Sequence, residues 1–377
     1  METRVLIVDL NHMAHLYYHS NHQLSVTVNI GGVTREKITT IQSNCLKSIV
    51  RWSKYGRLPT AICFDRPVPS RRAYWNSKFS DMSGERAYKG NREKMPDVMF
   101  EGVSDCEQLL RQAGASCYAA YNYEADDLIF ACVQRAKVKY PGCPIDIVTN
   151  DADLLPLVDE TVSVFLRSKT GTYAVSKDLE KVHYVQVTPD NFQEVVERLS
   201  AYKGFMIPYN TLLLHKLLRG DSSDQFQRKE ISRMFPPTKY NILIQRMLED
   251  NVPVDKIFRY GASSYNVIYR DTKLPYQGTV QDALNDPNKA NLILKITPPE
   301  QLLQIIEVLR KYTNLSEEQL ATISYVYRGM NLNQDYPSKN PQESRRAFVI
   351  SEDDDIRNFD EIELQKACSP LQIVLPK

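Results

Sequence analysis

The chain has 377 residues, of which 42% are hydrophobic and 25% are charged, the usual balance of globular proteins. At roughly 100–200 residues per domain, this length allows two domains or one large domain with appendages. The 47 Lys and Arg residues nearly balance the 46 Asp and Glu residues, so the net charge of +1 excludes a uniformly basic nucleic-acid coat. No signal-peptide core and no apolar run of about 18 residues occurs, so we expect a cytoplasmic protein without membrane contact. Seven cysteines without a C-x-x-C pair predict reduced thiols.

Three short apolar runs each end in an aspartate. They are RVLIVD, which ends at Asp9, TAICFD, which ends at Asp65, and IDIVTND, which ends at Asp151. Because these runs do not alternate apolar and polar residues, they predict strands buried on both faces of a parallel sheet. Segments with helical patterns lie between them, at 39–55, 103–113 and 125–138. This alternation predicts an α/β fold, in which ligands bind outside the carboxyl ends of the strands.

The chain continues with an expected strand and then with mostly helical patterns. The strand is expected at 161–167, and the helices at 191–201, 211–219, 240–249, 300–312 and 315–327. The last 27 residues contain seven acids and three bases, a local net charge of −4, and we interpret them as a solvated acidic tail. We therefore predict two parts, an α/β domain over residues 1–224 and a mostly helical C-terminal region over residues 225–377.

Nine acidic residues in five segments define the candidate site. Each lies where a predicted element begins or ends: Asp9, Asp65, Glu124, Asp126, Asp127, Asp151, Asp153, Asp221 and Asp224. Carboxylates gathered at one sheet edge would raise one another's pKa and destabilise the fold. Divalent cations remove this repulsion, and Mg²⁺ prefers carboxylate oxygens and water as ligands. Since two such ions about 4 Å apart can stabilise both reacting oxygens of a phosphodiester, the pattern indicates a two-metal phosphodiesterase.

The order of these acids (Asp, Asp, ExDD, DxD, GDxxD), with the segment AYKGNREK between the second and third groups, resembles the 5′-nucleases with a PIN-like fold. These are flap endonucleases and 5′–3′ exonucleases, particularly the small bacteriophage type, and the resemblance covers roughly residues 4–224. It implies a FEN-like domain whose central, mostly parallel sheet is flanked by helices, and a host-cytoplasmic location if the protein is phage-encoded. It also implies two Mg²⁺ ions, with Mn²⁺ as an acceptable substitute. The first ion would be held by Asp9, Asp65, Glu124 and Asp126, and the second, partly through water, by Asp127, Asp151, Asp153, Asp221 and Asp224.

A basic segment lies between Asp65 and Glu124. Residues 51–100 contain eleven Lys and Arg and five acids, a local net charge of +6, and aromatic residues are interspersed among them. Cations and stacking rings together are typical of single-strand binding. In the resembling family this place is the helical arch, here about residues 66–100, through which the single-stranded 5′ arm threads. The resemblance implies catalytic contacts to the scissile phosphate from Lys89 and Arg92, and further nucleic-acid contacts from Tyr88, Arg71, Arg72 and Lys216.

The sequence departs from the family pattern after Asp224. The family continues with a Gly-rich helix–three-turn–helix that grips the duplex, often with K⁺, whereas QFQRKEISRMFPPTKY contains no glycine. Without glycine, backbone amides cannot approach a phosphate as closely. We expect side-chain contacts from Arg228, Lys229 and Arg233 in their place.

We expect a Mg²⁺-dependent structure-specific 5′-nuclease that acts near single-strand/duplex junctions in replication or repair. It would be a flap endonuclease or 5′–3′ exonuclease, or would degrade RNA strands as RNase H does. Its substrate would be DNA or an RNA/DNA hybrid with a free 5′ end, and its C-terminal region would bind a replication protein. Two alternatives stay open. One is a PIN-type endoribonuclease, although such domains are shorter and lack the basic segment; the other is a non-catalytic DNA-binding or assembly module with a nuclease fold.

Four histidines follow Asp9 at helical spacing: His12, His15, His19 and His22. A metal cluster is one interpretation of this spacing. We interpret these residues instead as the polar face of a helix beside the sheet, because the resembling family has no such histidine site.

Overall fold

The computed structural model describes residues 4–19, 23–30, 33–65, 95–120, 123–167, 184–220, 229–258, 300–330 and 355–376. Eight of the residues predicted for the site or for nucleic-acid contacts lie outside these ranges, and their roles stay predictions: Arg71, Arg72, Tyr88, Lys89, Arg92, Asp221, Asp224 and Arg228. Within the described ranges, no helix is long and apolar enough to cross a membrane.

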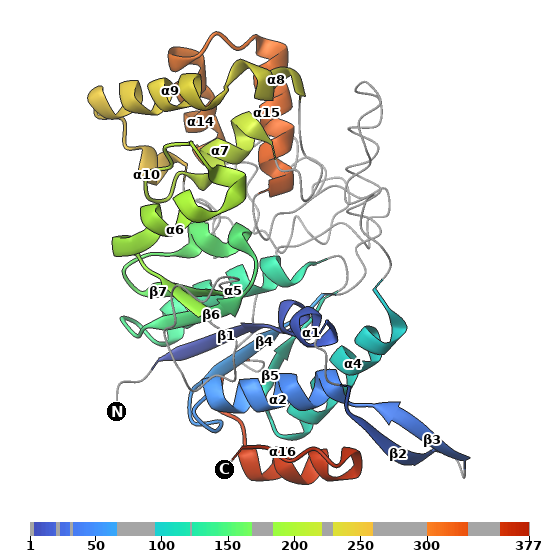
Figure 1. The fold of residues 1–377 in the computed structure, drawn as a ribbon. Helices are drawn as coiled ribbons and strands as arrows, with labels where there is room; N and C mark the ends of the chain where they lie inside the picture. Colours follow the sequence, from blue (N-terminus) through green and yellow to red (C-terminus); the bar gives the residue numbers. More distant parts are fainter. Residues whose placement is uncertain are drawn as a thin grey trace, which may run out of the picture.

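A six-stranded sheet of order β5-β4-β1-β6-β7-β8 forms the centre of the N-terminal part (Figure 1). Its strands are β1 (Val5–Asp9), β4 (Thr60–Cys63), β5 (Ser116–Tyr118), β6 (Ile145–Thr149), β7 (Val162–Arg167) and β8 (Tyr184–Val187). Neighbouring strands are parallel except for β7 and β8, which are antiparallel. The predicted α/β fold with a mostly parallel sheet is therefore confirmed.

Helices cover both faces of this sheet. The helices α1 (Leu10–Tyr18), α2 (Thr40–Trp52) and α4 (Asp97–Gln112) lie on one face, and α5 (Ala125–Lys139) lies on the other. Successive residues of β1 contribute to both cores, since Val5 and Ile7 pack on the α5 side and Leu6 and Val8 on the α1 side. Burial on both faces explains why this run shows no alternation of apolar and polar residues.

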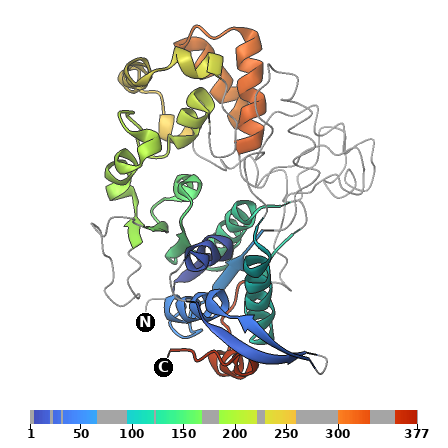
Figure 2. The same ribbon diagram turned by 45° about the vertical axis from the view of Figure 1, so that its right-hand side comes forward.

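The α5 face continues into a helical part, which Figures 1 and 2 show at one end of the molecule. Its main helices are α6 (Phe192–Arg198), α7 (Leu212–Arg219), α8 (Lys229–Met234), α9 (Pro237–Glu249), α10 (Val254–Ile257), α14 (Glu300–Tyr312) and α15 (Glu317–Met330). Short 3₁₀ helices connect parts of the chain: η1 (Ala152–Leu157), η2 (Pro189–Asn191), η3 (Ser200–Tyr202) and η4 (Ser369–Leu371). Residues of this part share one continuous hydrophobic core with α5, and the predicted C-terminal helices are confirmed.

Some elements were not expected from the sequence. The strands β2 (Ser25–Ile30) and β3 (Val33–Ile38) form a separate antiparallel hairpin. The sheet strands β5 and β8 are three and four residues long. All seven cysteines lie within the described ranges and are free thiols there.

The acid-rich C-terminal segment folds back onto the N-terminal part (Figure 1). Its helix α16 (Glu361–Cys368) buries Leu364 and Cys368 in the core that α1, α2 and α4 form. Asp355 forms ion pairs with Arg135 and Lys139 at 2.8 and 3.0 Å. The interpretation of a solvated tail is therefore corrected for residues 355–376. The interpretation was based on the net charge of the segment, but the apolar residues between the acids pack into the core.

Candidate active site

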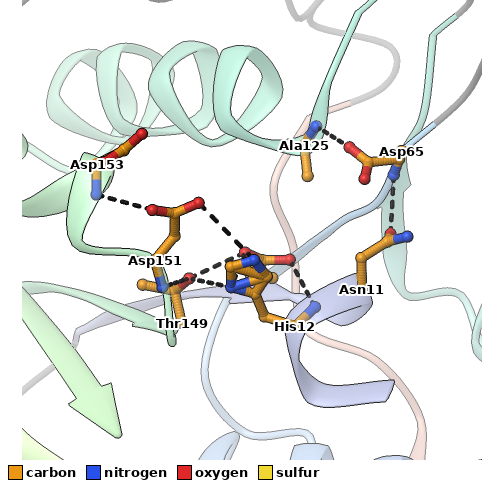
Figure 3. Close-up of polar contacts among 8 residues, drawn as sticks. Asn11, His12, Asp65, Ala125, Thr149, Asp151 and Asp153 are labelled. Carbon is orange, nitrogen blue, oxygen red and sulfur yellow. Dashed lines mark hydrogen bonds and ion pairs between the residues drawn. The ribbon is translucent and has the colours of Figure 1, made fainter. Parts of the chain in front are cut away.

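Asp65, Asp151 and Asp153 lie on the two sides of the N-terminus of α1 (Figure 3). Asp9 is the last residue of β1, Asp65 lies two residues beyond β4, and Asp151 lies two residues beyond β6. Because β4, β1 and β6 are parallel neighbours, their carboxyl ends bring these three acids to one edge of the sheet.

Asp9 is held in place by two donors. It is the N-cap of α1, and its Oδ1 accepts a hydrogen bond from the backbone N–H of His12 at 3.2 Å. Its Oδ2 accepts a hydrogen bond from the Thr149 hydroxyl at 2.9 Å. Although Asp9 is only 1% exposed, these bonds and the positive end of the helix dipole stabilise its carboxylate.

Asp151 and Asp153 form a second pair of acids beside Asp9. Asp151 Oδ1 accepts from the backbone N–H of Asp153 at 2.8 Å, and the Asp151 N–H donates to Thr149 Oγ1 at 3.0 Å. Thr149 therefore links this pair to Asp9. The Nζ of Lys216 lies 2.6 Å from Asp153 Oδ1, and the lysine side chain is 5% exposed. Because Lys216 is buried in this ion pair, the predicted nucleic-acid contact would require it to leave Asp153.

Asp65 and the start of α5 form the other side of the site. Asp65 Oδ1 accepts from the backbone N–H of Ala125 at 2.7 Å, and the Asp65 N–H donates to Asn11 Oδ1 at 2.9 Å. These bonds connect β4 to both α1 and α5, as Figure 3 shows. They place Asp65 beside Glu124, the N-cap of α5, and Asp126 in the first turn of that helix.

Asp127 has a different environment from the other predicted ligands. Its Oδ2 accepts from the backbone N–H of Glu124 at 3.0 Å, and the Glu124 side chain accepts from the Asp127 N–H, which makes a capping box. Asp127 is 1% exposed. This geometry gives it a structural role at the start of α5, while its predicted contact with the second metal stays a prediction.

His12 joins the site although we expected only a polar helix face from it. Its Nδ1 lies 3.5 Å from Asp9 Oδ2, and its Nε2 lies 3.8 Å from Asp151 Oδ2. The sequence contains a signal for this position, because a residue three places after an N-cap lies one helical turn away on the same face. Asn11 and Thr149, which bond to Asp65 and Asp9, were also missed, since single polar residues beside strand ends are common.

The donor atoms of this edge fit a hard divalent cation, because they are carboxylate oxygens supplied by separate segments. Lys216 and His12 are the basic groups that contact the acids among the described residues. In the same ranges, no group of three or more His, Cys, Asp or Glu side chains converges closely enough to hold an ion. The carboxylates bond to Thr149, to Lys216 and to backbone amides, and Asp221 and Asp224 lie outside the described part.

Residues 4–190 match the sequence profile of the family described as 5′-3′ exonuclease, N-terminal resolvase-like domain. Residues 4–190 therefore form a domain of the 5′–3′ exonuclease family. The matched range contains the described acids of the site and the whole basic segment. The resemblance inferred from the order of the acids is thereby confirmed.

The chain matches only part of the length of each curated relative. DNA polymerase I of Lactococcus lactis subsp. lactis is 32% identical over 139 residues, which are 37% of this chain and 14% of the polymerase. A 5′-3′ exonuclease of Buchnera aphidicola subsp. Schizaphis graminum is 26% identical over 153 residues, which are 41% of this chain and 47% of that protein. The match thus spans less than half of either relative.

Solved structures were compared as well. A bacteriophage T5 flap endonuclease, in a complex with DNA and metal ions, is 14% identical, and the match covers 87% of this chain and 98% of that chain with a TM-score of 0.45. The strand order and the helical layers described above define the fold.

Proposed function

We propose that this chain is a divalent-metal-dependent, structure-specific 5′-nuclease that hydrolyses phosphodiester bonds near single-strand/duplex junctions. The observation that carries the proposal is the gathering of Asp9, Asp65 and Asp151 at three neighbouring strand ends within a 5′–3′ exonuclease family domain. A protein that only bound DNA would gain nothing from this mutual repulsion of carboxylates. The proposed substrate is DNA or an RNA/DNA hybrid with a free 5′ end, and the proposed role is flap or primer removal in replication or repair.

The proposed residue roles follow the two sides of the site. Asp65, Glu124 and Asp126 would hold one Mg²⁺ together with Asp9, and Asp151 and Asp153 would hold a second with Asp221 and Asp224. Such ions would supply positive charge to the phosphate and lower the pKa of a reacting water.

Other residues of the chain would support these roles. The Thr149 hydroxyl fixes the orientation of the Asp9 carboxylate, and Lys216 fixes that of Asp153. Lys89 and Arg92 would neutralise charge on the scissile phosphate.

Cleavage of a labelled 5′-flap DNA tests this proposal. The native chain should cut the flap with Mg²⁺ or Mn²⁺ and should be inactive in EDTA. Asp153→Asn should lower the rate about 100-fold or more, since a residue that positions a metal is worth at least this much. The matched control is Asp190→Asn, an exposed aspartate at η2, which should cut within about twofold of the native rate.

Two results would contradict the proposal. The first is absence of cleavage by the native chain, and the second is equal cleavage by native protein and Asp153→Asn. An unstructured RNA of the same length belongs in the same experiment. Cutting of this RNA without cutting of the flap would favour the endoribonuclease alternative.

A further inference from the structure

A pocket of about 360 Å³ lies directly beside the acids, on the side of the sheet that α1 covers. It is formed between the outer half of α1 and the carboxyl ends of β6 and β7. The described residues that line it are Asp9, His12, Met13, His15, Leu16, His19, Val148, Thr149, Asn150, Arg167 and Tyr184. Because Asp9 and Thr149 belong to this lining, the pocket and the candidate active site adjoin each other.

The basic residues of the lining favour an anionic ligand. Arg167 ends β7, is half-buried, and has no ion-pair partner among the described residues. His15 and His19 are exposed, lie one helical turn apart on α1, and line the same pocket as Arg167. Asp9 is the one acid of the described lining, and it is already engaged by Thr149 and His12.

The remaining lining residues are partly polar (His12, Thr149 and Asn150) and partly apolar. Met13, Leu16 and Val148 supply aliphatic and thioether surface. Tyr184 adds an aromatic ring, which Trp52 holds from behind in an edge-to-face contact with ring centroids 5.4 Å apart. This pocket therefore offers groups for both halves of a nucleotide. The guanidinium and the two histidines suit the phosphate, and the apolar residues suit the base and its sugar.

The volume sets the size of the ligand. Pockets for small molecules begin at about 300 Å³, so this one accommodates a single nucleotide and excludes a duplex. Arginine suits the phosphate because its planar fork can donate two parallel hydrogen bonds to phosphate oxygens.

We propose that this pocket binds one nucleoside 5′-monophosphate unit, with its phosphate on Arg167, His15 and His19 and its base and sugar against the apolar wall. Two sources share this chemistry, the terminal nucleotide of a strand and a released mononucleotide. The link to a cleaved strand rests on the proposed nuclease function, whereas nucleotide binding itself does not.

The test is equilibrium binding of thymidine 5′-monophosphate to the full chain, measured by calorimetry in EDTA. Arg167→Gln should weaken binding at least tenfold, because hydrogen bonds to a charged group contribute this much or more. Arg246→Gln is the matched control, since Arg246 is exposed on α9 in the helical part, and it should leave the affinity unchanged. Leu16→Trp, which fills the pocket but keeps Arg167, should also weaken binding, and circular dichroism checks that each variant is folded.

Binding of three further compounds, measured in the same way, identifies the chemical class of the ligand. Inorganic phosphate and thymidine should each bind at least tenfold more weakly than the monophosphate, because each offers only half of the contacts. A 5′-phosphorylated single strand that binds more tightly than the monophosphate identifies the strand end as the ligand; equal affinity identifies the released nucleotide. Both results retain the nucleotide site.

The proposal is overturned if Arg167→Gln and Leu16→Trp bind the monophosphate as the native chain does, or if phosphate alone binds equally well. Because EDTA removes metals, this test is independent of cleavage. A chain that binds the nucleotide but never cuts flap DNA would contradict only the proposed function. A chain that cuts but does not bind the nucleotide would contradict only the pocket.

Discussion

Lys216 and Asp153 show how one ion pair decides the role of a residue. By its position in the sequence, Lys216 is a helix lysine available to nucleic acid. In the fold its side chain is 5% exposed and its Nζ lies 2.6 Å from Asp153 Oδ1. The lysine therefore compensates negative charge within a group of acids, which would otherwise repel one another.

Lys216→Met tests this compensation. The methionine keeps most of the apolar stem but leaves the Asp153 carboxylate without its partner. We expect the free energy of unfolding to fall by about 1–2 kcal/mol at pH 7, measured by urea denaturation. Lys203→Met, at an exposed lysine, should change it by less than about 0.5 kcal/mol. Equal effects of the two substitutions would show that the ion pair contributes nothing to stability.

At the scale of elements, the turn between α2 and β4 has to accommodate the C-terminal segment. Gly56 in this turn has a φ of +73°, in the left-handed region that favours glycine. A Cβ atom at this position would lie 2.4 Å from the carbonyl oxygen of Phe359. The Phe359 N–H also donates to the Gly56 carbonyl oxygen at 3.3 Å, so the two backbones must approach closely.

Gly56→Ala should therefore destabilise the protein for two reasons, the positive φ and the close contact. Gly114→Ala isolates the first reason, because Gly114 has a φ of +79° and a Cβ there would meet no atom within 4 Å. We expect Gly114→Ala to cost about 1 kcal/mol and Gly56→Ala at least about 1 kcal/mol more, by urea denaturation. Equal costs would mean that the Phe359 segment moves away without loss.

The same segment is anchored by Asp355, whose ion pairs depend on pH. Burial alone would raise the pKa of Asp355, but hydrogen bonds from Arg135 and Lys139 lower it to about 2. Since the folded pKa lies below the ordinary value of 3.8, the ion pairs contribute full stability above pH 4. This contribution is lost as the pH falls through the folded pKa, between about pH 4 and 2.

Asp355→Asn should lower the free energy of unfolding by about 1–2 kcal/mol at pH 7, a value reduced for partial screening by solvent. The variant should also lose less stability than the native chain between pH 4 and pH 2. Urea denaturation across this range measures both effects, with Asp190→Asn as the exposed control. Parallel pH profiles for the native chain and Asp355→Asn would contradict the assignment.

At the scale of the whole molecule, two hydrophobic cores lie on opposite faces of one sheet. The core on the α5 side extends into the helical part, and the core on the α1 side is closed by the C-terminal segment. In this second core α16 contacts α4, although more than 240 residues separate them in the chain. Residues of β1 and of α16 therefore pack in the same hydrophobic core.

Leu364→Ala measures the contribution of this closure. Leu364 is fully buried in the second core, so we expect a loss of about 2–4 kcal/mol in the free energy of unfolding. Ile362→Ala, two residues away on the same helix and 68% exposed, should cost less than about 0.5 kcal/mol. If both substitutions cost the same small amount, α16 does not close this core in solution.

Much of the fold could be predicted because its signals are local. The runs that end at Asp9, Asp65 and Asp151 are buried on both faces, and this burial is visible as mainly apolar sequence without an apolar–polar alternation. The short strands β5 and β8, of three and four residues, were not predicted from the sequence. The docking of residues 355–376 escaped prediction because ion pairs and core contacts with distant residues leave no local pattern.

The sequence by itself determined the α/β class, the 5′–3′ exonuclease resemblance and the acids at the strand ends, because each depends on residue type and order along the chain. Only the tertiary structure decided how these acids are held. It placed His12 between Asp9 and Asp151, paired Lys216 with Asp153, and formed the pocket at Arg167. The contacts of His12 with Asp151 and of Lys216 with Asp153 join residues far apart in the chain, and their energies depend on distance and burial, which the fold alone supplies.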